Sequence, residues 1–212
     1  MAQGEAEPSP DPSVGRLLAF TDGVVAIALT LLILPLLDGV TDAADAGLTT
    51  AGYLQSSGRL LLSLFLSFVI VTSFWSSHHR IYEGVARYNG ALLWLNGAWM
   101  LTIVWLPVAT ALTGTMTTDA LQEVLYIGTM LLGSLLLVAS IFVVRRHPEL
   151  WSKKGPPPVD GLAANIALTI LYAVALLLAL IVPGLDYSGL FLLFLTPVLQ
   201  RFVVRRLPGA TA

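Results

Sequence analysis

The residues with the clearest chemical potential are a carboxylate and two hydroxyls inside an apolar run. Residues 16–37 are long enough to cross a bilayer, because a membrane-spanning helix needs about 20 mostly apolar residues. Yet the run contains Asp22, Thr21 and Thr30. A charged side chain at membrane depth costs at least about 2.5 kcal/mol, and such residues commonly mark ion paths or proton relays. The position of Asp22 therefore indicates that this helix does more than anchor the chain.

One stripe of the same helix consists of three aliphatic side chains and one hydroxyl: Ile27, Thr30, Leu31 and Leu34. On a helical wheel these residues fall within an arc of about 100°, and Asp22 lies on another face. A stripe with this spacing is typical of packing between membrane helices. It is also compatible with a face that lines a path through the membrane.

Asp22 has candidate partners at the end of the second apolar segment, which should lie at the same depth. The candidates are Trp75, Ser76, Ser77, His78, His79 and Arg80, together with Arg16. Donors of this kind around a buried carboxylate would fix helix packing. They could also form a titrating proton site, because histidine changes charge near neutral pH. A metal site is not expected, since His78 and His79 point about 100° apart on a helix and no third histidine follows at i+4.

The composition predicts a membrane protein without disulfides. The 212 residues are 56% hydrophobic and 11% charged, whereas a soluble domain has roughly 25% charged residues. The absence of cysteine excludes disulfides and thiolate metal sites. No nucleophile–base pair or nucleic-acid signature is evident, so we expect neither an enzyme nor a cofactor nor a nucleic-acid partner.

The apolar segments predict an all-α membrane protein with six transmembrane helices. They cover residues 16–37, 58–77, 90–112, 120–144, 162–182 and 188–204. Only helices remain as spanning elements, because the alternation typical of barrel strands is absent. We expect residues 1–15 to be a disordered cytosolic tail, residues 16–206 the transmembrane domain and residues 207–212 a C-terminal tail. Pro35 and Pro107 can kink the first and third helices, and the fifth and sixth should form a tight antiparallel hairpin.

Basic residues predict the orientation, because cytosolic loops are enriched in Lys and Arg. With six spans, one side holds Arg16, Arg80, Arg87, Arg145, Arg146, Lys153, Lys154, Arg201, Arg205 and Arg206. The other side holds Asp38, Asp42, Asp45, Asp119 and Asp186, with Arg59 as the only basic exception. Both termini are therefore expected in the cytosol.

Three motifs in the first half of the chain resemble those of a known family. Arg16-x-x-x-Phe20-Thr21-Asp22 resembles the Arg-x-x-x-Phe-Ser-Asp signature of the endolysosomal potassium channels and their bacterial homologues, which lack a P-loop filter. The stretch from Trp75 to His79 resembles that family's Trp-x-x-His-His, and Asn96 with Leu106-Pro107 resembles motifs of its third helix. The last three segments match only in hydrophobic layout.

The resemblance implies a homotetramer whose first helices line a central pore. By position, Ile27 matches the narrowest aliphatic ring, Leu31 and Leu34 match further rings, and Thr30 matches a neighbouring hydroxyl layer. It also implies a structural network that holds the first helix, formed here by Arg16, Phe20, Thr21, Asp22, Trp75 and His78. The family's serine is threonine at position 21, which keeps the hydroxyl and adds a methyl group.

These inferences predict a potassium-preferring cation leak channel in a bacterial inner or plasma membrane. Its partners would be its own copies, the bilayer and permeating monovalent cations, with K⁺ passing transiently and no resident metal. The alternative is a proton-coupled transporter that uses Asp22 and His78, although the internal repeats found in many transporters are not visible here. A non-conducting scaffold would not explain the polar residues of the first span.

Overall fold

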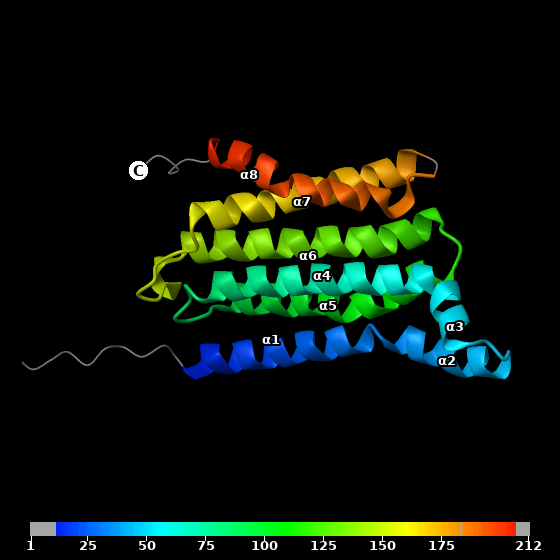
Figure 1. Cartoon of the computed structure of the whole chain (residues 1–212). Helices are drawn as coiled ribbons and strands as arrows, with labels where there is room; N and C mark the ends of the chain where they lie inside the picture. Colours follow the sequence, from blue (N-terminus) through cyan, green and yellow to red (C-terminus); the bar gives the residue numbers. More distant parts are fainter. Residues whose placement is uncertain (1–11, 183, 207–212) are drawn as a thin grey trace, which may run out of the picture.

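The chain is an all-helical bundle in the computed structural model, which describes residues 12–182 and 184–206 (Figure 1). The described part contains six helical stretches long and apolar enough to cross a membrane, which confirms the predicted fold class. The elements are α1 (Pro12–Leu31), α2 (Leu34–Asp45), α3 (Thr50–Ser56), α4 (Gly58–Tyr82), α5 (Gly90–Thr115), α6 (Ala120–Arg146), η1 (Pro148–Leu150), α7 (Val159–Ile181), η2 (Asp186–Leu195) and α8 (Thr196–Val204).

The first helix begins earlier than its hydropathy predicts. It starts at Pro12, so the last four residues of the expected tail 1–15 are helical. Proline suits this position because its fixed φ matches the helix and its missing N–H would have no helical partner there. Residues 1–11 of that tail and the predicted tail 207–212 lie outside the described residues.

Pro35 divides the first span into two helices. The prediction treated residues 16–37 as one helix, but α1 ends at Leu31 and α2 begins at Leu34. Proline has no N–H to donate to the carbonyl four residues earlier and its ring crowds that carbonyl, so the helix breaks one turn before it. Pro107, in contrast, lies inside the continuous helix α5.

The segment between the first two spans is helical, although its acidic residues suggested a loop. The helix α2 runs on to Asp45, and α3 folds back against it (Figure 1). The Tyr53 hydroxyl of α3 donates to the Leu36 carbonyl. Gly39 permits this contact, because a Cβ there would lie 3.0 Å from the Tyr53 hydroxyl oxygen.

The sixth span is not the single α-helix that the sequence predicted. It begins as the 3-10 segment η2 and continues as α8. Pro197, near the start of α8, cannot donate to the Leu193 carbonyl, and the Thr196 hydroxyl donates to that carbonyl instead. Close packing on α7 also constrains η2, since a Cβ on Gly189 would lie 3.2 Å from the Ala175 carbonyl oxygen.

The helix ends carry local hydrogen bonds that satisfy the backbone. The side chains of Asn89 and Asp119 accept from backbone N–H groups three residues later, at 2.9 and 2.8 Å, and so cap α5 and α6. Arg59, the basic exception on the acidic side, donates to the carbonyls of Thr113 and Met116 at the end of α5, at 3.3 and 3.2 Å. A cation at a helix C-terminus is favourable, which gives this residue a structural role on an otherwise acidic side.

The basic end of the bundle is held together by two connectors. The loop after α4 and the loop after α6 pair at an isolated antiparallel bridge between Val85 and Trp151. The Ser152 N–H donates to the Gly84 carbonyl at 2.8 Å, and Lys154 lies 3.3 Å from the Glu83 carboxylate. Figure 1 shows that α1 begins and α8 ends at this same end of the bundle.

Gly114 allows a close approach between α4 and α5. A Cβ at this position would lie 3.0 Å from the Cα of Leu60, whereas a Cβ on Gly97 of the same helix would meet nothing within 4 Å. We expect Gly114→Ala to destabilise the bundle by about 1–3 kcal/mol, the usual cost of overpacking. Gly97→Ala is the matched control and should be neutral or stabilising, because alanine favours helices. Thermal unfolding in detergent checks this, and equal midpoints for both variants would contradict it.

Candidate functional site

The helix α1 contacts its own chain through one face and leaves the opposite face open. Figure 1 shows it at the edge of the bundle, and it packs against α4 and α5. Its inward side chains Thr21, Val25 and Ala28 are at most 2% exposed. On the other side Phe20 is 63% and Ile27 61% exposed, so the single chain leaves a bulky apolar face without a partner.

A chain of buried hydrogen bonds fixes the inward face. The Thr21 hydroxyl donates to the Leu17 carbonyl at 2.9 Å and accepts from Asn96 Nδ2 at 3.0 Å. Asn96 Oδ1 accepts from His78 Nε2 at 2.6 Å. All three side chains are buried. Because α1, α5 and α4 each supply one member, the chain sets the rotation of α1 about its own axis.

His78 is held on both faces of its ring by aromatic side chains. The ring stacks on Tyr82 and on Trp99, each with centroids 4.4 Å apart. Since Asn96 Oδ1 can only accept, Nε2 carries the proton in this arrangement. His78 Nδ1 and Trp99 Nε1 are buried with no hydrogen-bond partner among the described residues. The imidazole is therefore positioned by stacking and by a single directional bond.

Asp22 makes a separate contact beside this chain. Trp75 Nε1 donates to Asp22 Oδ1 at 2.8 Å, which joins α1 to α4 a second time. Asp22 is half-buried, and Trp75 is 37% exposed. The carboxylate accepts a strong charge-assisted bond at this position, whereas the hydrogen bond of His78 goes to Asn96.

The structure gathers four of the six residues that the sequence assigned to the network. Thr21, Asp22, Trp75 and His78 lie at the junction of α1, α4 and α5. Phe20 lies on the open face, and Arg16 is exposed with no side-chain hydrogen bond or ion pair within residues 12–182 and 184–206.

The sequence-based assignment omitted Asn96, which forms the centre of the network. An asparagine within the apolar run 90–112 was the available signal, because a buried amide needs partners for both its donor and its acceptor.

The predicted stripe divides at the Pro35 break. Ile27, Thr30 and Leu31 belong to the open face of α1, and Leu31 is 38% exposed. Leu34 is 46% exposed but lies after the break, in α2, so its direction does not follow from the wheel of α1. The Thr30 hydroxyl donates to the Ile27 carbonyl at 2.7 Å, which leaves its oxygen lone pairs available to a cation.

The histidines do not form a metal centre in the part of the chain that the structure describes. No group of three or more His, Asp or Glu side chains gathers there. His78 faces Asn96, whereas His79 lies 3.8 Å from Glu83. The chemistry available on α1 is therefore that of an apolar face with one hydroxyl layer.

Comparison with known proteins relates this arrangement to a channel family. The family model described as the endosomal/lysosomal potassium channel TMEM175 matches residues 16–107, which contain all but the first four residues of α1 and the whole polar network. This segment is similar to the TMEM175 family over 92 of the 212 residues. The match confirms the resemblance drawn from the sequence, and the family is one of ion channels rather than of enzymes.

Bacterial relatives match the same half of the chain. A potassium channel of Chryseobacterium sp. is 35% identical over 101 residues, which cover 48% of this chain and 49% of the relative. A potassium channel of Chamaesiphon minutus is 36% identical over 101 residues, covering 46% and 48%. An endosomal/lysosomal proton channel TMEM175 of Danio rerio is 28% identical over 140 residues, covering 64% and 26%. The match therefore spans about half the length of the bacterial relatives.

A solved structure extends the likeness to the whole fold. The crystal structure of a lysosomal potassium-selective channel TMEM175 homologue from Chamaesiphon minutus superposes with a TM-score of 0.58 and 23% identity. The alignment covers 95% of this chain and 100% of that one. At this identity the likeness shows the fold, and it includes the last three spans, for which the sequence offered only hydrophobic layout.

The bond between Asn96 and Thr21 can be measured with a double-mutant cycle. We expect Asn96→Ala and Thr21→Val to be coupled by about 1 kcal/mol in the free energy of unfolding, because the two side chains share one buried hydrogen bond. The control cycle combines Asn96→Ala with Thr30→Val on the open face and should be additive. The measurement is denaturant unfolding in mixed micelles. Additivity in both cycles would mean that this bond does not hold α1.

Proposed function

We propose that four copies of this chain form a potassium-preferring cation leak channel, with α1 of each copy lining a central path. The observation that carries the proposal is the division of α1 into a hydrogen-bonded inner face and an open face bearing Ile27, Thr30 and Leu31. Relatives named as potassium channels and a fold shared with a potassium-selective channel homologue support it.

In this proposal Ile27 forms a dry neck. Four copies of its side chain around an axis would narrow the path, and an ion would shed part of its hydration to pass. Potassium sheds water more cheaply than sodium, so such a neck would favour potassium without a fixed binding site, and it could close by dewetting. Thr30 oxygens one turn away would replace part of the lost hydration.

The proposed setting is a bacterial inner or plasma membrane with both ends of the chain in the cytosol. The basic residues concentrate at the end where α1 begins and α8 ends, and the positive-inside rule places that end in the cytosol. Besides its own copies, the chain would meet only the lipid bilayer and permeating monovalent cations. No cofactor is needed for passive flux of K⁺.

The alternative of a proton-coupled transporter requires Asp22 and His78 to act together. Each has its own partner, Trp75 or Asn96, which favours a structural role for both. Vertebrate relatives are named as proton channels, so proton flux is a worthwhile second measurement. Loss of a saturable, proton-coupled flux in Asp22→Asn would support the transporter.

The proposed activity is tested by ion flux from proteoliposomes. We expect passive potassium flux to exceed sodium flux severalfold at matched protein density, because the neck discriminates through partial dehydration. The measurement is dye-reported flux under imposed potassium or sodium gradients. Absence of flux for both ions, in a preparation with intact helical content, would count against the leak channel.

The position of the neck is tested at Ile27. A polar or smaller side chain keeps the neck wet, so Ile27→Asn and Ile27→Ala should change conductance severalfold and reduce the potassium preference. Leu101→Ala is the control, since Leu101 is 70% exposed but lies on α5. Unchanged flux in both Ile27 variants would remove this residue from the path.

A further inference from the structure

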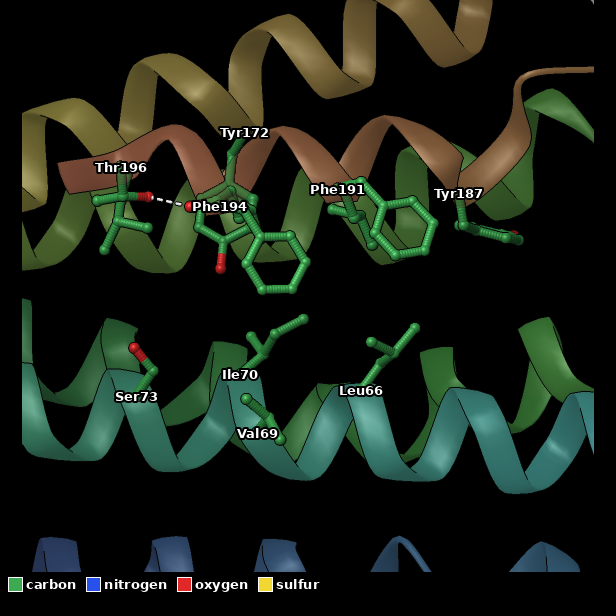
Figure 2. Close-up of a pocket in the computed structure, with 12 residues that line it drawn as sticks. Leu66, Val69, Ile70, Ser73, Tyr172, Tyr187, Phe191, Phe194 and Thr196 are labelled. Atoms are coloured by element: carbon green, nitrogen blue, oxygen red, sulfur yellow. Dashed lines mark hydrogen bonds between the residues drawn. The ribbon is translucent and has the colours of Figure 1, made fainter. Parts of the chain in front are cut away.

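An apolar groove lies between α4 on one side and α7 with η2 on the other (Figure 2). Its volume is about 360 Å³. The residues that define it are Leu66, Ile70 and Ser73 of α4, Tyr172 of α7, and Phe191 and Phe194 of η2. None of these residues belongs to α1, so the groove is separate from the face assigned to the ion path.

The position of the groove determines what can fill it. All its walls are membrane-spanning segments. Protein interiors leave few voids larger than a water molecule, and an apolar cavity does not hold water stably. A space of this size falls in the range of ligand sites, about 300–1,000 Å³. The lipid that surrounds these walls can supply an occupant of this size.

The two ends of the groove differ. Ser73 and the α8 residue Thr196 lie at one end, and Tyr187 lies at the other, where its hydroxyl donates to Gln122 Oε1 at 2.7 Å (Figure 2). The end with Ser73 and Thr196 faces the basic end of the bundle, because α4 and α8 both end there (Figure 1). A molecule with an apolar tail and a polar head near the basic end would match this order.

One arginine, Arg80, continues the groove toward the membrane surface. Arg80 is seven residues beyond Ser73 on α4, which places it on the same helix face about 10 Å further along. Its guanidinium donates to Ser76 and Ser77 at 2.7 and 3.1 Å, and so turns back toward the groove. Within residues 12–182 and 184–206 Arg80 forms no ion pair, so its charge can meet an anion.

The dimensions fit one acyl chain. Along α4 the groove extends from Ser73 to Leu66, seven residues of helix or about 10 Å. One leaflet contributes about 15 Å of hydrocarbon, so an acyl chain of that leaflet is long enough for this length. Aromatic walls such as Phe191 and Phe194, which stack with centroids 6.3 Å apart, present flat apolar surfaces to it.

We propose that this groove binds one acyl chain of an anionic phospholipid, with the phosphate beside Arg80. The lipid belongs to the leaflet at the basic end of the bundle. Its acyl chain fills the groove between the 3-10 segment η2 and α4. The proposal does not depend on ion conduction, because its evidence and its test concern lipid binding alone.

The test is native mass spectrometry of the full chain with equimolar phosphatidylglycerol and phosphatidylcholine of identical acyl chains. We expect the wild type to retain phosphatidylglycerol preferentially. Arg80→Gln should reduce that preference about fivefold, the effect of one basic residue near an anionic lipid. Arg146→Gln is the matched control, since it removes the same charge from α6, which contributes nothing to the groove. Equal reductions in both variants would overturn the headgroup assignment.

The tail site is tested by filling it. Ser73→Phe should lose most of the retained lipid, whereas Leu62→Phe, on the same helix outside the groove, should keep it. Phe194→Ala removes one wall of the groove and should also reduce lipid retention. This second variant tests the tail site if Ser73→Phe does not fold. Unchanged retention in both groove variants would overturn the proposal. So would a change of oligomeric state in Ser73→Phe with lipid retention intact, because the groove would then be an interface between copies.

Discussion

The arrangement of α1 depends on one buried chain of hydrogen bonds, from Thr21 through Asn96 to His78. A polar group in an apolar interior is costly unless its hydrogen bonds are made, so these three side chains are satisfied in only a narrow range of helix rotations. Once Thr21 faces Asn96, the opposite side of α1 must face away from the bundle. The open apolar face is thus a geometric consequence of the polar one, and the Asp22–Trp75 contact reinforces the same rotation.

The open face is limited in length by a proline, which interrupts the first span. Pro35 ends α1 at Leu31, so only the first five turns keep the rotation that the polar chain imposes. Beyond the break, α2 and α3 form a helical cap held by the Tyr53 bond to Leu36. This division separates a rigid, well-oriented part of the first span from a part whose direction is set by other contacts.

The remaining helices provide a support with two different sides. Toward α1, α4 and α5 contribute the polar network, while the outer part, α7 with η2 and α8, is apolar and leaves a groove against α4. The paired connectors at the basic end join the exits of α4 and α6. A bundle stabilised in this way can present one face to an ion path and another to lipid without the two sites sharing a residue.

The sequence alone determined the all-α class, the six spans, the polarity of their ends and the motifs of the first half. These features are local, because apolar length, charge position and residue spacing can be read along the chain. It also identified Thr21, Asp22, Trp75 and His78 as residues of one network. The tertiary structure decided which of the proposed members meet: it left Arg16 and Phe20 outside and placed Asn96 at the centre. It also decided the break that separates Leu34 from Ile27, the 3-10 start of the sixth span and the groove beside it. The reason is physical: hydrogen-bond partners from different helices, and the spaces between them, depend on relative rotation and packing, which a hydrophobic pattern does not specify.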